Sequence, residues 1–526
     1  MDMSVVVKSA WLNMLLQVCF RAGTFLGNAI MLRYISRELL GLVNVRLLLL
    51  YSTIVFLSRE SFRKSCLSKT DSEKTLKGSK MQLVNLIWLS VVAGIILSFL
   101  FCFIWIILLE QPSTQYLKQY HTSCICFACS AIIELTIEPM WIFGQKSGYI
   151  TSKVILEGIF LIVRSVLSVI VVILMPKYAL YGIAMSYLTA SIVYATLYFC
   201  FFFKVIHSKD NSSGFSNIRD IFPNLVADPF LDKDSTSLVK SFFKQSLLKQ
   251  FLTEGERYVM TLFRVLSFSQ QGVYDVINNL GSLAARFIFM PIEESYYVYF
   301  SQALERNVKK YPDSVMKQCC TSLSVVLKFV SLISFIILVF GYGYSYLLLD
   351  LYGGEILSNG EGPNLLRTYC IYVMFIALNG ITECFMFASM NQQQIDSYNF
   401  KMLLFSIVFL LSSLLFTKYL GGMGFILANC LNMGMRISQN ALFIQGFFSE
   451  TSYRPLKAII PSFQVVFMLL VSLLFTAISE KRYFEYPVVH VGVGCTCLLG
   501  VLTSVYYTEH EFIDFVKELL KKKKIK

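Results

Sequence analysis

Polar side chains recur at helical spacing inside strongly apolar stretches of this sequence. The first such stripe is Asn13, Gln17, Arg21, Thr24 and Asn28, which follow one another at steps of three or four residues. That spacing places side chains on one face of an α-helix. Because a charge at membrane depth is costly, an arginine there marks a cavity or a pathway by default.

Several later apolar stretches repeat the pattern. The members are Lys249, Thr253, Arg257, Thr261 and Arg264 with Glu254 and Glu256 alongside, then Asp275, Asn279, Ser282, Arg286 and Glu293, then Asn429, Asn432, Arg436 and Asn440, and the shorter sets Glu134 with Glu138 and Glu157 with Arg164. The planar fork of arginine binds two phosphate oxygens and keeps its charge. The stripes therefore favour a hydrated, arginine-lined cavity for an anionic head group, at the interface of two lobes as in internally repeated transporters. Alternatively, Arg and Glu on neighbouring helices pair and hold the bundle together.

Motifs for catalysis, cofactors or metals are missing from the sequence. No GxxxxGK[ST] phosphate loop occurs, so we expect no ATP hydrolysis by that route. The four His are scattered, and the 14 Cys form no pair of CxxC motifs at zinc-site spacing. We therefore expect no metal and no cofactor, and we favour transport over an enzymatic reaction.

The composition shows which elements must hold these side chains. Of the 526 residues 56% are hydrophobic and only 15% charged, with a mean hydropathy of +0.62, whereas soluble proteins carry about 25% charged residues. The formal net charge of +13 comes from basic residues that lie between apolar runs rather than on one soluble face. This distribution argues against nucleic acid as a partner and favours membrane lipid.

The apolar runs predict an all-α polytopic membrane protein, because a span needs about 20 mostly apolar residues. We expect about fourteen spans, near 10–31, 40–58, 83–109, 118–143, 150–174, 178–203, 240–266, 272–302, 317–349, 363–391, 400–418, 422–447, 456–479 and 487–507. A polar gap after the sixth span divides them into two six-helix lobes and a terminal pair. The expected domains are an N-terminal lobe 1–206, a cytosolic linker 207–239, a C-terminal lobe 240–447, a terminal helix pair 448–507 and a Lys-rich tail 508–526.

Basic residues orient these spans, because cytosolic loops are enriched in Lys and Arg. Residues 59–80 alone contain Arg59, Arg63, Lys64, Lys69, Lys74, Lys77 and Lys80, as many basic residues as the whole opposite side. This asymmetry predicts that both termini are cytosolic. Near the C-terminus, Lys523 and Lys524 resemble the dilysine retrieval signal of endoplasmic-reticulum membrane proteins. A plain polybasic end attracted to anionic lipid is the alternative.

Longer segments resemble one known family. They are Asn28–Arg33, Gly41–Arg46, Phe242–Met260, Gly272–Gly281, Pro291–Ser295, Asn379–Phe385 and Gly424–Met433. In this order they are similar to the Rft family of endoplasmic-reticulum membrane proteins. The resemblance implies a fourteen-helix, lipid-flippase-like fold of the multidrug/oligosaccharidyl-lipid/polysaccharide exporter superfamily. It also implies translocation of dolichol-pyrophosphate-linked oligosaccharide from the cytosolic to the lumenal leaflet, for protein N-glycosylation.

The resemblance carries the pattern of arginines in leading helices onto Arg21 and Arg46 as the best-placed pyrophosphate ligands. Other residues expected to bind the substrate in the cavity are Arg33 and Arg37, at the lumenal mouth, and Arg257, Arg264 and Arg286. Arg59 and Arg63 are expected at the cytosolic mouth. Asn28, Glu254, Glu256, Glu293, Glu383 and Arg436 are expected to line the cavity or to couple an ion. Two other interpretations stay open: a non-transporting accessory factor of the same pathway, and an ion-coupled exporter of small molecules.

Overall fold

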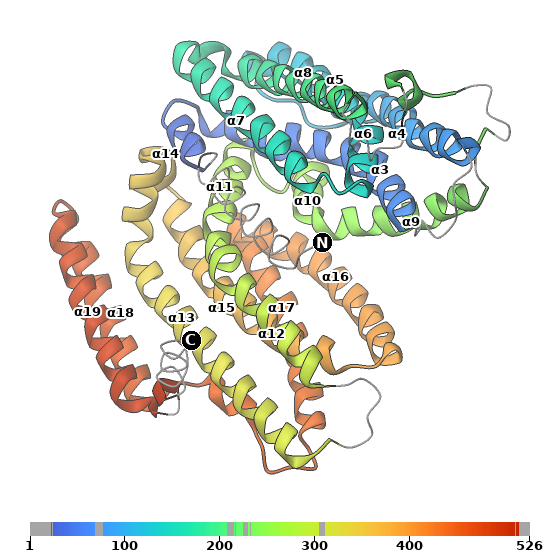
Figure 1. Cartoon of the computed structure of the whole chain (residues 1–526). Helices are drawn as coiled ribbons and strands as arrows, with labels where there is room; N and C mark the ends of the chain where they lie inside the picture. Colours follow the sequence, from blue (N-terminus) through green and yellow to red (C-terminus); the bar gives the residue numbers. More distant parts are fainter. Residues whose placement is uncertain are drawn as a thin grey trace. The chain divides into compact units, whose positions relative to one another are not determined.

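The computed structural model describes most of the chain. The described residues are 23, 25–68, 77–207, 215, 217–224, 230–231, 233–304, 311–510 and 512–514. These residues form helices, turns and loops, with no β-strand among them. They divide into two units, Met1–Gly272 and Val273–Lys526, and the helices of each unit can be followed in Figure 1.

The first unit is built on helices of different lengths and polarities. They are α2 (Arg37–Gly41), α3 (Leu48–Ser68), α4 (Lys77–Phe103), α5 (Thr114–Leu135), α6 (Glu138–Lys146), α7 (Ile150–Leu174), α8 (Ala179–Ile206), α9 (Lys233–Thr253) and α10 (Gly255–Phe263), followed by the start of α11 (Phe268–Ala284). Helix α8 packs against both α5 and α7, and α3 packs against α4, α5 and α9. A core that includes Ile87, Met140, Tyr194 and Phe202 joins these helices.

Two close glycines fix where α2 meets the start of α11. A Cβ atom built on Gly272 would lie 2.6 Å from the carbonyl oxygen of Arg37 and 2.6 Å from the amide nitrogen of Gly41. A Cβ on Gly41 would overlap the carbonyl oxygen of Phe268. Only glycine permits so close a backbone approach, so these two residues position α2 and the segment that follows it.

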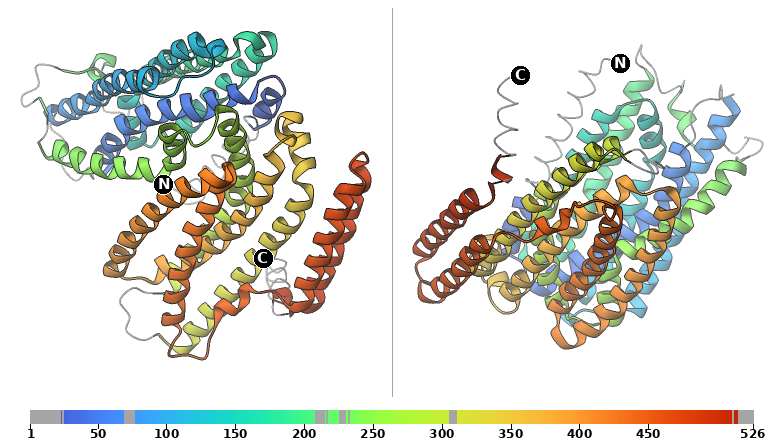
Figure 2. Two further views of the ribbon diagram at one scale, coloured as in Figure 1. Left: turned by 180° about the vertical axis from the view of Figure 1, so that it is seen from behind. Right: turned by 90° about the horizontal axis from the view of Figure 1, so that it is seen from below.

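The second unit contains the remaining helices. They are most of α11, then α12 (Met290–Ala303), α13 (Asp313–Gly353), α14 (Glu355–Ser358), α15 (Gly362–Ser389), α16 (Gln392–Leu420), α17 (Gly422–Phe447), α18 (Phe463–Arg482) and α19 (Pro487–Thr508). Helix α15 packs against α12, α13 and α17, and α16 packs against α17. Figure 2 shows α16 and α17 side by side from behind.

The last two long helices form a pair that packs on α13. Helices α18 and α19 contact each other, and α18 contacts α13, which both figures show. Leu332, Val339, Val465, Leu469, Val501 and Val505 form their shared core. His490 ties the pair to α13, because its ring nitrogens lie 2.9 Å from Ser479 Oγ and 3.0 Å from the carbonyl oxygen of Gly343.

Ten helical segments in the described part are long and apolar enough to cross a membrane. They coincide with ten of the spans expected from the sequence and confirm an all-α polytopic membrane protein, although not the count of fourteen. Of the others, 10–31 lies mostly outside the described residues. The stretches 240–266, 272–302 and 422–447 are largely helical but are not among these ten segments, and each contains one of the polar stripes.

The boundary between the two units falls after Gly272, beyond the linker 207–239 that the sequence marks as the lobe boundary. Helices α9 and α10 therefore belong to the first unit, where α9 packs on α3. The division into two six-helix lobes, a terminal pair and a tail stays a prediction.

Among the residues that the structure describes, three π-helical turns lie between helices or at the end of one. They are η1 (Leu42–Leu47), η2 (Ile104–Leu108) and η5 (Ala285–Phe289). Such turns are rare and frequently occur at functional sites. Two of the arginines selected from the sequence, Arg46 and Arg286, lie in η1 and η5, so the helices that present them are locally irregular.

Candidate functional site

Two ion pairs join α3 to the α5–α6 region of the first unit. Arg59 contacts the Glu134 carboxylate at 2.5 Å, and Tyr51 donates a hydrogen bond to the same carboxylate. Arg63 binds Glu138 with two hydrogen bonds of 2.7 Å each. Both carboxylates are nearly buried, at 10% and 1% side-chain exposure. Arg59 and Arg63, which the sequence places at the cytosolic mouth, are therefore paired with carboxylates within the first unit.

An aromatic ring completes the second pair. The Arg63 guanidinium lies 3.6 Å from the centre of the Trp141 ring, and the Lys153 ammonium lies 4.1 Å from it. The Trp141 indole donates to a Glu157 carboxylate oxygen at 3.3 Å. Cations held by both a carboxylate and an aromatic face are well stabilised in a low-dielectric site. This cluster therefore fits the structural alternative that the sequence left open.

Arg46 has a different environment. Its side chain is fully buried in η1, with the guanidinium 5.0 Å from the centre of the Phe268 ring and 3.8 Å from a Glu110 carboxylate oxygen. Its three guanidinium nitrogens have no hydrogen-bond partner among the described residues. A buried cation without hydrogen bonds is costly, so Arg46 is the arginine here with capacity to bind an added anionic group.

Four other arginines that were expected to bind the substrate lie in the first unit. Arg33 is exposed, and Arg37 begins α2. In α10, Arg257 pairs with Glu254 at 3.0 Å, one turn apart. Arg264 follows α10 in a left-handed conformation, with φ of 53°, and is exposed.

Two other polar residues that were expected to line the cavity lie in this unit. Asn28 is exposed, and Glu256 lies in the first turn of α10. Arg21 lies outside the described residues, as do the tail lysines Lys523 and Lys524.

The second unit contains its own polar network between α15, α16 and α17. The Glu383 carboxylate accepts hydrogen bonds from Asn379 at 2.7 Å and from the Tyr398 hydroxyl at 3.3 Å, and it lies 3.4 Å from Arg436. Asn440, which is fully buried, donates to the side chain of Asn379 at 3.3 Å. The sequence placed Glu383 and Arg436 in one cavity lining, and the structure brings them together as an ion pair.

One further expected glutamate lies near this network, and one further expected arginine lies away from it. The carboxylate of Glu293 on α12 lies against the backbone of Gly380, one helical turn from Glu383. Arg286 is exposed and donates hydrogen bonds within its own helix, to Asn279 at 3.4 Å and to Ser282.

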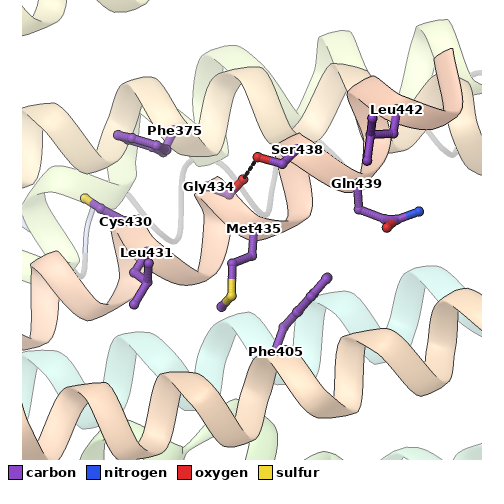
Figure 3. Close-up of a pocket in the computed structure, with 9 residues that line it drawn as sticks. All are labelled: Phe375, Phe405, Cys430, Leu431, Gly434, Met435, Ser438, Gln439 and Leu442. Atoms are coloured by element: carbon purple, nitrogen blue, oxygen red, sulfur yellow. Dashed lines mark hydrogen bonds between the residues drawn. The ribbon is translucent and has the colours of Figure 1, made fainter. Parts of the chain in front are cut away.

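A groove lies between α16 and α17 and extends across α17 to Phe375 on α15. Its apolar part has a volume of about 580 Å³ and is lined by Phe375, Phe405, Cys430, Leu431, Gly434, Met435, Ser438, Gln439 and Leu442, which Figure 3 shows as sticks. A polar pocket of about 460 Å³ is lined by Met390, Asn391, Gln393, Gln394, Ser397, Tyr398, Lys401, Gln439 and Phe443. Gln439 borders both, so the two form one groove with an apolar and a polar end.

Sequence reasoning missed several members of these sites. The sequence predicted no role for four residues that each contact or border a charged or polar site, namely Tyr51, Trp141, Tyr398 and Lys401. A signal existed for the first cluster, because Arg59 and Arg63 are four residues apart, as are Glu134 and Glu138. No group of three or more His, Cys, Asp or Glu in the described part is arranged to hold a metal.

The fold and these sites define a class of protein. The chain superimposes on lipid II flippase MurJ in an inward closed conformation with a TM-score of 0.62 and 13% identity, covering 97% of this chain and 99% of that one. A multidrug resistance MATE family transporter of the MOP superfamily gives 0.55 and 12%, covering 82% and 96%. The molecule is a polytopic membrane protein with a lipid-flippase-like fold.

The family follows from the sequence matches. The model of the Rft protein family matches residues 5–519, so the chain belongs to that family. It is 42% identical to the Man(5)GlcNAc(2)-PP-dolichol translocation protein RFT1 of Xenopus tropicalis, covering 98% of this chain and 96% of the relative. The proteins of the same name from Mus musculus and Drosophila melanogaster are 41% and 34% identical, covering 97% and 94% of this chain and 95% and 94% of the relatives.

Proposed function

We propose that this chain translocates dolichol-pyrophosphate-linked oligosaccharide from the cytosolic to the lumenal leaflet of the endoplasmic reticulum, for protein N-glycosylation. One observation carries the proposal: relatives named as Man(5)GlcNAc(2)-PP-dolichol translocation proteins match nearly the whole chain at up to 42% identity. The flippase-like fold supports movement of a lipid. Moving a lipid between leaflets breaks no covalent bond, so the proposal assigns no catalytic residue and no cofactor.

The physical problem is the polar head group. Each unsatisfied polar group costs several kcal/mol in hydrocarbon, and a pyrophosphate with several sugars has many. A hydrated path lined by cations lowers that cost, while the polyprenol chain stays in lipid. We propose that the chain presents this path to one leaflet at a time.

Arg46 is the proposed pyrophosphate ligand on this path. Its three guanidinium nitrogens have no hydrogen-bond partner among the described residues, and it lies in a π-helical turn whose packing can change. An arriving diphosphate oxygen pair matches the arginine fork. Because the side chain is fully buried, access requires the contacts with Phe268 and Glu110 to open.

The other arginines are assigned by position. We propose that Arg33 and Arg37 guide the head group near one mouth, and that Arg264 and Arg286, both exposed, contact its glycan or phosphate. Arg59, Arg63, Arg257 and Arg436 are paired with carboxylates, so their first role in the proposal is to hold their helices together.

Ion coupling and localisation complete the proposal. Glu254, Glu256, Glu293 and Glu383 are the proposed proton or cation carriers, and Glu383 is the best supported because it joins α15, α16 and α17. We place both termini in the cytosol, where Lys523 and Lys524 would serve retrieval to the endoplasmic reticulum.

Reconstitution of the purified chain with defined dolichol-linked oligosaccharide tests the proposal. Flipping is read as the fraction of glycan that becomes accessible to a lectin outside the vesicles. We expect Arg46→Lys, which keeps the charge but loses the fork, to slow flipping by about tenfold, the value of one charge-assisted hydrogen bond. Arg219→Lys, an exposed arginine outside the membrane helices, is the matched control and should match the wild type.

Two results would contradict the proposal in different ways. Wild-type protein that binds the lipid but never flips it, while cells still need the chain for N-glycosylation, would favour the accessory-factor interpretation. A folded Arg46→Lys variant with wild-type flipping would remove Arg46 from the path. Thermal unfolding of each variant establishes that it is folded.

A further inference from the structure

The groove between α16 and α17 has two chemically different ends. Four of its side chains on α16, Gln394, Ser397, Lys401 and Phe405, follow one another at steps of three or four residues and so share one helix face. The polar part begins at Asn391 and the apolar part extends to Phe405. At 1.5 Å per residue, these fourteen steps correspond to a groove about 21 Å long.

Apolar side chains from three helices line one end. Phe405 extends from α16 toward α17, and Met435 and Leu431 extend from α17 toward α16 (Figure 3). Gly434 has no side chain to fill this space, and Phe375 on α15 lies across α17 from Phe405 (Figure 3). Contact between such a surface and water is unfavourable, whereas contact with a hydrocarbon chain is favourable.

The other end suits a glycosylated phosphate. Gln393, Ser397 and Gln439 offer amide and hydroxyl groups that can donate to and accept from sugar hydroxyls. Lys401 is the cation in this lining, and the lining contains no carboxylate. No ion pair joins Lys401 to any residue that the structure describes. An anionic group is therefore the complementary partner.

The polar end also contacts the charged network of this unit. Tyr398 forms part of the wall, and its hydroxyl donates to Glu383, which pairs with Arg436. A head group in the polar pocket would thus lie one side chain away from that ion pair. In the orientation predicted from the sequence, the N-terminal end of α16 faces the cytosol, the leaflet from which the lipid is proposed to start.

We propose that this groove is a docking site for an isoprenoid lipid carrying a glycosylated phosphate, with the chain along Phe405 and Leu431 and the phosphate at Lys401. This inference rests on the proposed function and names a second contact point for its substrate. The site lies wholly within the second unit, separate from Arg46. An ordinary anionic phospholipid uses the same apolar end and the same lysine but leaves the amide groups without sugar partners.

Photocrosslinking to the full chain in phosphatidylcholine nanodiscs tests the docking site. The probe is a photoactivatable polyprenyl diphosphate that bears chitobiose, and the crosslinked peptides are located by mass spectrometry. We expect labelling in α16 and α17. Lys401→Gln should weaken binding by about fivefold, since a lysine near an anionic lipid contributes about that factor. Lys418→Gln, an exposed lysine at the other end of α16, should leave binding unchanged.

A second variant fills the apolar end. A Cβ on Gly434 would lie 3.5 Å from Phe375 Cε1, an ordinary contact, so the backbone tolerates a side chain. Gly434→Leu should abolish labelling in α17. Gly446→Leu is its control on the same helix, because a Cβ there meets nothing within 4 Å.

The outcomes separate the site from the function. Labelling outside α16 and α17, or unchanged labelling in both groove variants, overturns the site. Competition by phosphatidylglycerol as effective as by unlabelled probe overturns the isoprenoid assignment. If the labelling follows the expected pattern but reconstituted protein does not flip the lipid, the proposed function fails while the site stands. If Gly434→Leu loses the labelling but flips the lipid normally, the groove is not a contact point on the translocation path, and the proposed function stands.

Discussion

The pair between Arg63 and Glu138 gives a quantitative test of what the membrane charges do. The two side chains are bonded twice at 2.7 Å, and the carboxylate is only 1% exposed. Removing one partner of a buried pair costs about 3–5 kcal/mol, because it leaves an uncompensated charge. Arg63 is 17% exposed and keeps its contact with Trp141. We therefore expect the lower end, about 3 kcal/mol, for Glu138→Leu.

Replacing both partners should recover most of that loss. Arg63→Met with Glu138→Leu leaves no buried charge, and such apolar replacements are often neutral or stabilising. The double variant should then be about 2–3 kcal/mol more stable than Glu138→Leu alone, so the two sites are strongly coupled. The measurement is the free energy of unfolding of the full chain in lipid bicelles, for the wild type, both single variants and the double variant.

A control lies on the same helix. Lys64 and Glu60 are 3.5 Å apart, one turn apart on α3, with side chains 35% and 22% exposed. Lys64→Gln should change the free energy of unfolding by less than about 0.5 kcal/mol, the usual value for such a pair. A Glu138→Leu variant as stable as the control, or a double variant whose loss equals the sum of the single losses, would refute the reasoning. A stable double variant that no longer supports N-glycosylation would instead assign Arg63 to the substrate path.

Three further substitutions test individual contacts by the same unfolding measurement. Gly41→Ala should destabilise by about 1–3 kcal/mol, because its Cβ would overlap the Phe268 backbone; an unchanged value would show that α2 can move away freely. Asn440→Leu should cost about 1–3 kcal/mol by removing the buried bonds to Asn379 and Thr382, and Asn432→Leu, half-buried on the same helix, should cost less. His490→Phe should cost about 1–2 kcal/mol and increase protease cleavage between α18 and α19, since it removes the contacts with Ser479 and Gly343; equal cleavage would contradict that role.

The sequence was informative where a physical rule needs only local spacing. Apolar length alone located ten segments that the structure contains as membrane-length helices. The sequence also put Glu254 alongside the polar stripe that contains Arg257, and these two residues form an ion pair.

Partners between distant helices could not be assigned by spacing alone. Arg59 lies 75 residues before Glu134, and nothing in the spacing of one stripe selects the other. The equal four-residue steps of Arg59 with Arg63 and of Glu134 with Glu138 were the available clue. Taken together, these two spacings would have predicted two ion pairs between α3 and the α5–α6 region.

Mean hydropathy did not reveal the polar end of the groove in the second unit. The predicted span 400–418 excludes the first turns of α16, which begins at Gln392, because Gln393, Gln394 and Ser397 lower the mean hydropathy. Those turns line the polar pocket. A threshold on mean hydropathy leaves out the polar ends of a membrane helix. Those ends contain the residues best suited to bind a lipid head group at the membrane interface.

The distribution of partners gives the membrane charges two different roles. A charge that is paired within a unit, as Arg63 is with Glu138, is already compensated by its partner and stabilises the unit without a ligand. Arg46 has three buried nitrogens without a hydrogen-bond partner among the described residues, so its desolvation is compensated only by Phe268 and the longer contact with Glu110. An anion that satisfies those nitrogens would bind the more strongly because the protein does not already do so. Arg46 is therefore the arginine whose replacement should separate lipid translocation from folding.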